Sequence, residues 1–177
     1  MMTALQERNE EAREEIREEA RKCDEKTLSY LAGFFDGEGS VMVDRRKGRP
    51  ERVNKNMHMT PTVTLKVCNT DPEPLFLFAE VFGGTVRVDD GVRSGRNKPL
   101  YNYRIHKNRS FVVLEMLLPY LRVKRSQAEL ALKVYEIQDR YDRHDMQESM
   151  SEVLPLLEQL AELNNRKHLQ KDGRFIL

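Results

Sequence analysis

The chain has 177 residues, of which 39% are hydrophobic and 33% charged, with 30 Lys and Arg against 29 Asp and Glu for a net charge of +1. This composition suits one folded domain of ordinary core size and excludes a disordered or collagen-like chain. No apolar run reaches the ~18 residues that a membrane helix needs, and the charged N-terminus is unlike a secretory signal, so we expect an intracellular protein.

The charge is distributed unevenly along the chain. Residues 40–133 hold eighteen bases and nine acids (+9), whereas 1–26 and 134–177 each hold six bases and nine acids (−3). Residues 27–39 contain two acids and no base. A strongly basic central segment favours a nucleic-acid partner, which the near-neutral total conceals.

A charged helix is predicted within residues 1–26. Thr3 and Gln6 fit a capping box, and Glu and Arg recur at spacings that allow pairing between successive turns. The apolar stripe is thin and consists of Leu5, Ala12, Ile16 and Ala20. We therefore expect a solvated helix appended to the domain, with a partner-binding or coiled-coil segment as the alternative.

The elements that follow alternate between helices and pairs of strands. Helices are expected from Leu28 to about Gly37, over 71–83, and from Ser110, Ser126 and about residue 150; strands are expected near 40–46, 60–67, 85–89 and 100–106. In each strand aliphatic or tyrosine residues alternate with polar or basic ones. This pattern predicts an α+β domain over 27–165, with helices on one face of an antiparallel sheet, followed by a tail at 166–177.

The other face of this sheet should be polar and open. A solvated surface is the simplest interpretation, but basic loops at 45–55 and 91–98 extend the same face, and a β-ribbon can enter the major groove of DNA. Many of its side chains can also contact base edges or phosphates. The side chains of this kind are those of Arg46, Thr60, Thr62, Thr64, Lys66, Arg87, Asn102 and Arg104.

Small residues mark one face of the helix predicted at 28–37. They are Ser29, Ala32, Gly33 and Asp36, at positions i, i+3, i+4 and i+7. A glycine inside a helix costs up to about 1 kcal/mol relative to alanine, and close approach of another backbone would offset that cost. The stripe predicts a tight helix–helix contact. Glu38 follows it, either as a solvent-facing turn residue or as a metal-binding carboxylate.

Residues 31–39, LAGFFDGEG, resemble the signature of the LAGLIDADG homing endonucleases. The αββαββ order with following helices also resembles the domain of that family, with its saddle-shaped sheet. The motif occurs once, as in the single-motif, homodimeric branch. The resemblance implies a site-specific double-stranded DNA endonuclease, active as a homodimer joined through the small-residue stripe, that cuts a long pseudo-palindromic target.

The resemblance also implies catalytic residues. Glu38, the last acid of the motif, would bind a divalent cation, Mg²⁺ or another such as Mn²⁺, at the scissile phosphates, with the Gly37 carbonyl as a further ligand. Such oxygen donors are those that Mg²⁺ prefers. Lys124 would lie near the phosphate and the attacking water, with a solvated lysine as the alternative. Asn69 takes the place of a polar residue that contacts the water network at the end of the second strand.

In this family the sheet lies in the major groove, with one half-site for each subunit. The resemblance therefore assigns DNA contacts to the outward positions Ser40, Met42, Asp44, Arg46, Thr60, Thr62, Thr64, Lys66, Arg87, Asp89, Asn102 and Arg104, with Arg109 and Arg125 holding phosphates. Members of the family also act as RNA maturases that assist intron splicing, and a degenerate member could bind DNA as a regulator without cutting it. Both functions stand as alternatives.

Overall fold

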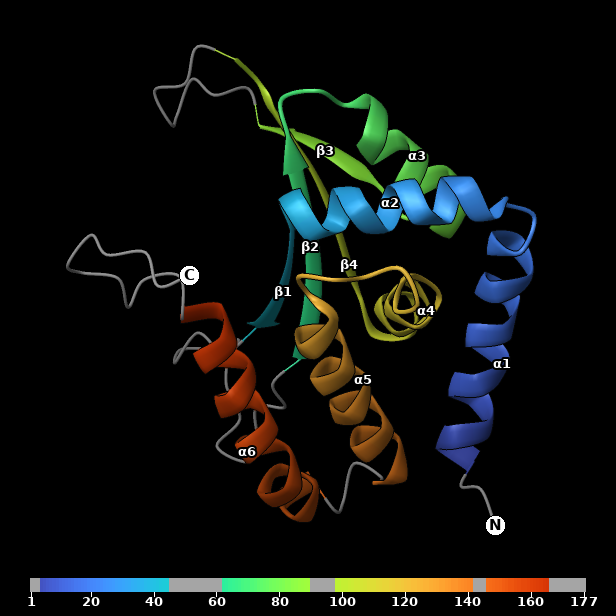
Figure 1. Cartoon of the computed structure of the whole chain (residues 1–177). Coiled ribbons are helices and arrows are strands. Elements are labelled where there is room, and N and C mark those ends of the chain that lie inside the picture. Colours follow the sequence, from blue (N-terminus) through green and yellow to red (C-terminus); the bar gives the residue numbers. More distant parts are fainter. Residues whose placement is uncertain (1–3, 45–61, 90–97, 142–145, 166–177) are drawn as a thin grey trace, which may run out of the picture.

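The structure is a computed structural model that describes residues 4–44, 62–89, 98–141 and 146–165 (Figure 1). Its helices are α1 (Ala4–Ala20), α2 (Glu25–Glu38), α3 (Glu73–Phe82), α4 (Lys107–Leu117), α5 (Arg125–Arg140) and α6 (Met146–Asn165). Its strands are β1 (Gly39–Asp44), β2 (Thr62–Asn69), β3 (Val86–Asp89) and β4 (Leu100–His106). The predicted order of elements is confirmed.

The four strands form one antiparallel sheet in the order β1-β2-β4-β3. In the β1–β2 pair Gly39 lies opposite Val67, and in the β2–β4 pair Val67 lies opposite Tyr103. Because side chains alternate along a strand, this register puts the aliphatic and aromatic positions of the three strands on one face. They are Val41, Val63, Leu65, Val67, Tyr103 and Ile105, all buried.

The helices cover that face, as predicted (Figure 1). α2 contributes Leu31 and Phe35 to the core, while α3 contributes Phe78, whose ring stacks on Tyr103 with centroids 5.6 Å apart. One inward position differs from the prediction: Val88 is 60% exposed. Val88 lies on β3, an edge strand of the sheet, one residue before that strand ends at Asp89.

The predicted solvation of the N-terminal helix is wrong. Helix α1 crosses α4 at a steep angle and also contacts α3 and α5 (Figure 1). Arg13 is only 5% exposed, its guanidinium lies 3.8 Å from the Phe111 ring centroid, and it pairs with Asp139 at 2.6 Å. Ala20 is fully buried. The thin apolar stripe did not indicate this packing, because the stem of an arginine and its cation–π contact provide part of it.

None of the helices in the described ranges is long and apolar enough to cross a membrane. The predicted cap Thr3, the tail at 166–177 and most of the two basic loops lie outside the described residues.

Candidate active site and nucleic-acid interface

The motif helix leads directly into the first strand. Helix α2 ends at Glu38, and Gly39 begins β1 with an extended backbone at φ −78°. Glycine is required there by space: a Cβ at position 39 would lie 2.3 Å from the Phe35 ring and 2.6 Å from the Phe35 carbonyl oxygen. Because no loop intervenes, the exposed Glu38 is held at the end of the sheet by both elements.

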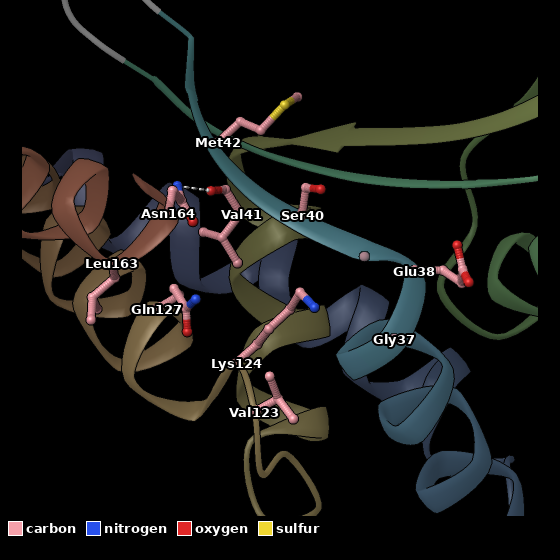
Figure 2. Close-up of a pocket in the computed structure, with 11 residues that line it drawn as sticks. Gly37, Glu38, Ser40, Val41, Met42, Val123, Lys124, Gln127, Leu163 and Asn164 are labelled. Atoms are coloured by element: carbon pink, nitrogen blue, oxygen red, sulfur yellow. Dashed lines mark hydrogen bonds between the residues drawn. The ribbon is translucent and has the colours of Figure 1, made fainter. Parts of the chain in front are cut away.

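A pocket of about 400 Å³ opens beside this junction (Figure 2). Gly37 and Glu38 line one side of it, and Lys124 with Gln127 line another from the start of α5. Glu38 is the only acid among the described residues that line the pocket. In Figure 2 its carboxylate points away from the Lys124 side chain, toward the outside. An exposed carboxylate and a lysine thus border one pocket, and carboxylate oxygens suit a hard cation.

Lys124 is buried and anchored to the motif helix. Its ammonium donates a hydrogen bond to the carbonyl oxygen of Asp36, and its backbone N–H donates to the Asp36 carboxylate at 2.9 Å. A solvated lysine, the alternative to a role in the site, is therefore contradicted. The predicted site residues Glu38, Gly37 and Lys124 come together in the structure.

Asn69 lies at the same end of the sheet but does not line the pocket. The register sets Gly39 opposite Val67, so Asn69 is two residues further toward the end at which α2 arrives. Its amide oxygen accepts a hydrogen bond from the backbone N–H of Asp71 at 2.9 Å. This bond fixes the turn before α3, a common use of asparagine that its sequence position alone did not indicate.

Two polar residues of the pocket, Gln127 and Asn164, were not identified from the sequence. Gln127 lies three residues after Lys124 on α5, and helical spacing could have indicated that the two share a face. Asn164, near the end of α6, donates from its amide nitrogen to the carbonyl oxygen of Val41 at 2.9 Å (Figure 2). That carbonyl belongs to the edge strand β1, so the contact depends on tertiary structure and left no signal in the sequence.

The outer face of the sheet carries an ordered row of polar residues. Ser40 lies opposite Lys66, and Lys66 lies opposite Arg104, so that three strands contribute to the row. Ser40 and Arg104 are exposed and Lys66 is half-buried. Arg87 is exposed and lies opposite Asn102, whose amide oxygen accepts from the Cys68 thiol. Basic side chains thus face away from the helices, as predicted.

One outward position is not exposed. Thr64 is fully buried and its hydroxyl shares a hydrogen bond of 3.0 Å with Nδ1 of His106. It lies between Met42 and His106 on the neighbouring strands. The expectation that Thr64 reads DNA directly is therefore wrong in this arrangement.

Other predicted contacts are only partly described. Arg46 and Thr60 lie outside the described residues, and so do the side chains of Asp44, Thr62 and Asp89, whose backbones belong to strands. Met42 is half-buried on β1.

The two arginines expected to hold phosphates bind backbone carbonyls instead. Arg109 donates from Nη1 to the carbonyl oxygen of Phe82 at 2.6 Å, at the end of α3. Arg125 donates from Nε to Leu121 and from Nη2 to Pro119, both at 3.1 Å. Arg109 thereby supplies a donor to a carbonyl at the C-terminal end of α3, and Arg125 bonds the turn between α4 and α5. Arg125 is exposed, whereas Arg109 is half-buried.

The predicted dimer stripe is divided between two faces of α2. Ser29 and Gly33 are exposed, but Ala32 is fully buried in the chain's own core beside Leu31 and Phe35. Asp36 is engaged within the chain by the turn before α5. Ala32 is thus wrong as an interface residue because it is buried, whereas the partly exposed Asp36 stays a prediction. The exposed face instead joins Ser29 and Gly33 to Gly37 and to Tyr30, which is 50% exposed.

The described residues contain no group of three or more His, Cys, Asp or Glu side chains that could hold a metal ion. Glu38 and Gly37, the metal ligands predicted from the resemblance, both line the pocket.

Known proteins are similar to this chain in sequence and in fold. The DNA endonuclease I-CreI of Chlamydomonas reinhardtii is 30% identical over 153 residues, covering 82% of this chain and 83% of that protein. The chain belongs to the LAGLIDADG homing endonuclease family. A comparison with models of protein families found no match.

Solved homing endonucleases agree in fold. The I-CvuI structure in complex with the I-CreI target has a TM-score of 0.59 and 24% identity, over 85% of this chain and 86% of that one. The archaeal intron-encoded I-Vdi141I complexed with DNA has a TM-score of 0.60 and 16% identity, over 85% and 87%. The predicted α+β fold of this family, with an additional N-terminal helix, is confirmed.

Proposed function

We propose that this protein is a site-specific double-stranded DNA endonuclease that acts as a homodimer. The observation that carries the proposal is that Glu38 and Lys124 line the same pocket, at one end of an open, basic sheet face. The relative I-CreI is a DNA endonuclease, and the solved relatives I-CvuI and I-Vdi141I are in complex with DNA. These features together favour cleavage at a bound duplex.

A divalent cation, Mg²⁺ in particular, fits the donors of this site. Glu38 has an exposed carboxylate and Gly37 a backbone carbonyl, and hard cations prefer such oxygens. I-CvuI structures were determined in the presence of magnesium and of calcium. Bound there, the cation would neutralise phosphate charge and activate water. Glu38 and Gly37 would hold it at the scissile phosphates.

The remaining chemistry falls to the residues around Glu38. Lys124 places a positive charge beside the attacked phosphate, where it stabilises the negative charge that develops as the bond to the leaving oxygen breaks. Its burial and its bonds to Asp36 hold that charge in place before the DNA arrives. Asn69 is proposed as a further catalytic residue because it lies at the same end of the sheet. No protein nucleophile is required, since water attacks phosphorus.

The sheet face is proposed to bind the major groove, with one half-site for each subunit. Side chains on its described part can donate to base edges and phosphates. The proposed set is Ser40, Met42, Lys66, Arg87, Asn102 and Arg104, with Arg125 at its border; Arg46, Asp44, Asp89, Thr60 and Thr62 extend it as sequence-based predictions.

Two copies are proposed to pair through the exposed face of α2. Gly33 is open: a Cβ added there would meet no described atom of its own chain within 4 Å. The packing of a single chain thus gives no reason for glycine in the middle of a helix, where alanine is better by about 1 kcal/mol. Close approach of a second α2 gives one. Pairing would also bring two Glu38 carboxylates to the centre of a twofold target.

The test is cleavage of a duplex obtained by selecting cut sites from a randomised DNA pool, with Mg²⁺ present. Glu38→Gln should abolish cutting and keep binding in a gel-shift assay, whereas Glu18→Gln, an exposed acid on α1, should keep both. Cutting by Glu38→Gln at the wild-type rate would overturn the assignment. Tight site-specific binding without a nicked product at any divalent cation concentration would favour the regulator. Accelerated intron splicing that survives Glu38→Gln would favour a maturase.

A further inference from the structure

We propose that Asp36 is a positioning residue that holds Lys124 in its working place relative to Glu38. The inference rests on the proposed function and deepens it. Asp36 precedes Glu38 by two residues on α2, whereas Lys124 lies at the start of α5. Contacts between these distant parts of the chain converge on this single aspartate.

The Asp36 carboxylate accepts hydrogen bonds from consecutive backbone N–H groups. Those of Arg122 and Val123 donate to Oδ2 at 2.7 and 3.1 Å, and that of Lys124 donates to Oδ1 at 2.9 Å. Hydrogen bonds to an ionised acceptor are stronger than neutral ones. The backbone on which Lys124 is mounted is therefore attached to the motif helix.

This arrangement replaces an ordinary helix cap. Lys124 is the N-cap residue of α5, and its side chain makes no capping bond. The helix begins at Arg125, one residue before the Ser126 expected from the sequence, and the acceptor for its first N–H groups comes from α2. A local residue would have capped α5 equally well. An acceptor from the motif helix has the further effect of tying the two elements together.

Asp36 and Lys124 are joined by a second hydrogen bond, in which the side chain belongs to the lysine and the backbone to the aspartate. The Lys124 ammonium donates to the backbone carbonyl oxygen of Asp36, one residue before Gly37. Lys124 is only 7% exposed, so the position of its charge is set by protein contacts. Asp36 thus fixes the position of the Lys124 backbone through its carboxylate. It fixes the position of the Lys124 ammonium through its carbonyl, next to the segment that carries Glu38.

Loss of the carboxylate should affect turnover more than binding. The three N–H groups would lose their acceptor, the turn at 122–124 would shift, and Lys124 would move with it. Misplacement of a catalytic group by about 1 Å costs on the order of 100-fold in rate. The proposed DNA-binding row on the sheet does not contact Asp36, so affinity for DNA should persist.

The experiment measures single-turnover cleavage and DNA affinity separately, with the full-length protein, Mg²⁺ and a selected duplex. The variants are Asp36→Ala, Asp36→Asn, Lys124→Met and the double variant Asp36→Ala/Lys124→Met. Asp24→Ala is the matched control, because Asp24 caps the other end of α2 by accepting from the Thr27 N–H at 2.7 Å. It removes an acid and a cap from the same helix, far from the pocket.

We expect Asp36→Ala to cut about 100-fold more slowly with unchanged affinity. Asp36→Asn keeps one side-chain oxygen, so its cleavage rate should lie between those of Asp36→Ala and the wild type. It replaces Asp36→Ala in the test if that variant does not fold. Asp24→Ala should cut as wild type does. In the Lys124→Met background the Asp36→Ala change should cause little further loss, because interacting residues give non-additive effects.

Wild-type cutting by both Asp36 variants would overturn the inference, and so would an Asp36→Ala effect that is undiminished in the Lys124→Met background. Equal loss of cutting in Asp24→Ala would also overturn it, by showing a general effect of helix capping. An inactive wild-type protein would instead refute the proposed endonuclease function, so the two failures are distinguishable.

Discussion

Lys66 and Arg104 occupy directly opposite positions on β2 and β4, so that two cations lie side by side on the outer face of the sheet. The major-groove edge of guanine presents two acceptors to such side chains. The pair therefore indicates where the proposed DNA-binding face reads guanine.

Replacing Lys66 by Met should weaken DNA binding and relax discrimination for guanine at one position of each half-site, by about 1–3 kcal/mol. Binding of a set of single-base target variants, followed at several salt concentrations, measures this. Arg109→Met is the matched control, because Arg109 donates to Phe82 at the end of α3 and should alter stability without altering base preference. Unchanged preference in Lys66→Met would contradict the prediction.

Gly33→Ala should act in opposite directions on the single chain and on the dimer. Alanine stabilises the helix by up to about 1 kcal/mol, since no described atom of the chain obstructs its methyl group. In a dimer the same methyl groups would separate the two α2 helices and weaken association. Sedimentation analysis of the dissociation constant measures the second effect. Ser29→Ala adds no volume on the same face and should leave the dimer intact; a Gly33→Ala dimer as tight as wild type would exclude this interface.

Arg13→Met should destabilise the fold by about 3 kcal/mol, the usual cost of breaking a buried ion pair. Arg13 loses both the bond to Asp139 at 2.6 Å and the contact with the Phe111 ring, which attach α1 to α5 and α4. Urea denaturation gives the free energy of unfolding. Arg21→Met removes an exposed pair with Glu14 and should cost below about 1 kcal/mol. Equal effects of the two substitutions would show that α1 adds little through Arg13.

The order of elements and the family were predictable from the sequence because they depend on local patterns. Alternation identified which residues of β1, β2 and β4 face the core, and the motif over 31–39 identified Glu38. Hydrophobic periodicity reports burial within one element, and here it was reliable for Leu31, Val67 and Tyr103, all of which are buried.

Partners between elements were decided only by the tertiary structure. Spacing alone grouped Ala32 and Asp36 with Ser29 and Gly33, yet the first packs into the core and the second binds the turn before α5. The sequence predicted a solvated helix around Arg13, but this side chain contacts Phe111 and Asp139 from two other helices. A helical face is defined by what packs against it, and the sequence of one helix does not contain that information. The sequence therefore determined that Glu38 ends the motif helix, while the contacts of Asp36 with a turn 86 residues away decided where Lys124 lies relative to it.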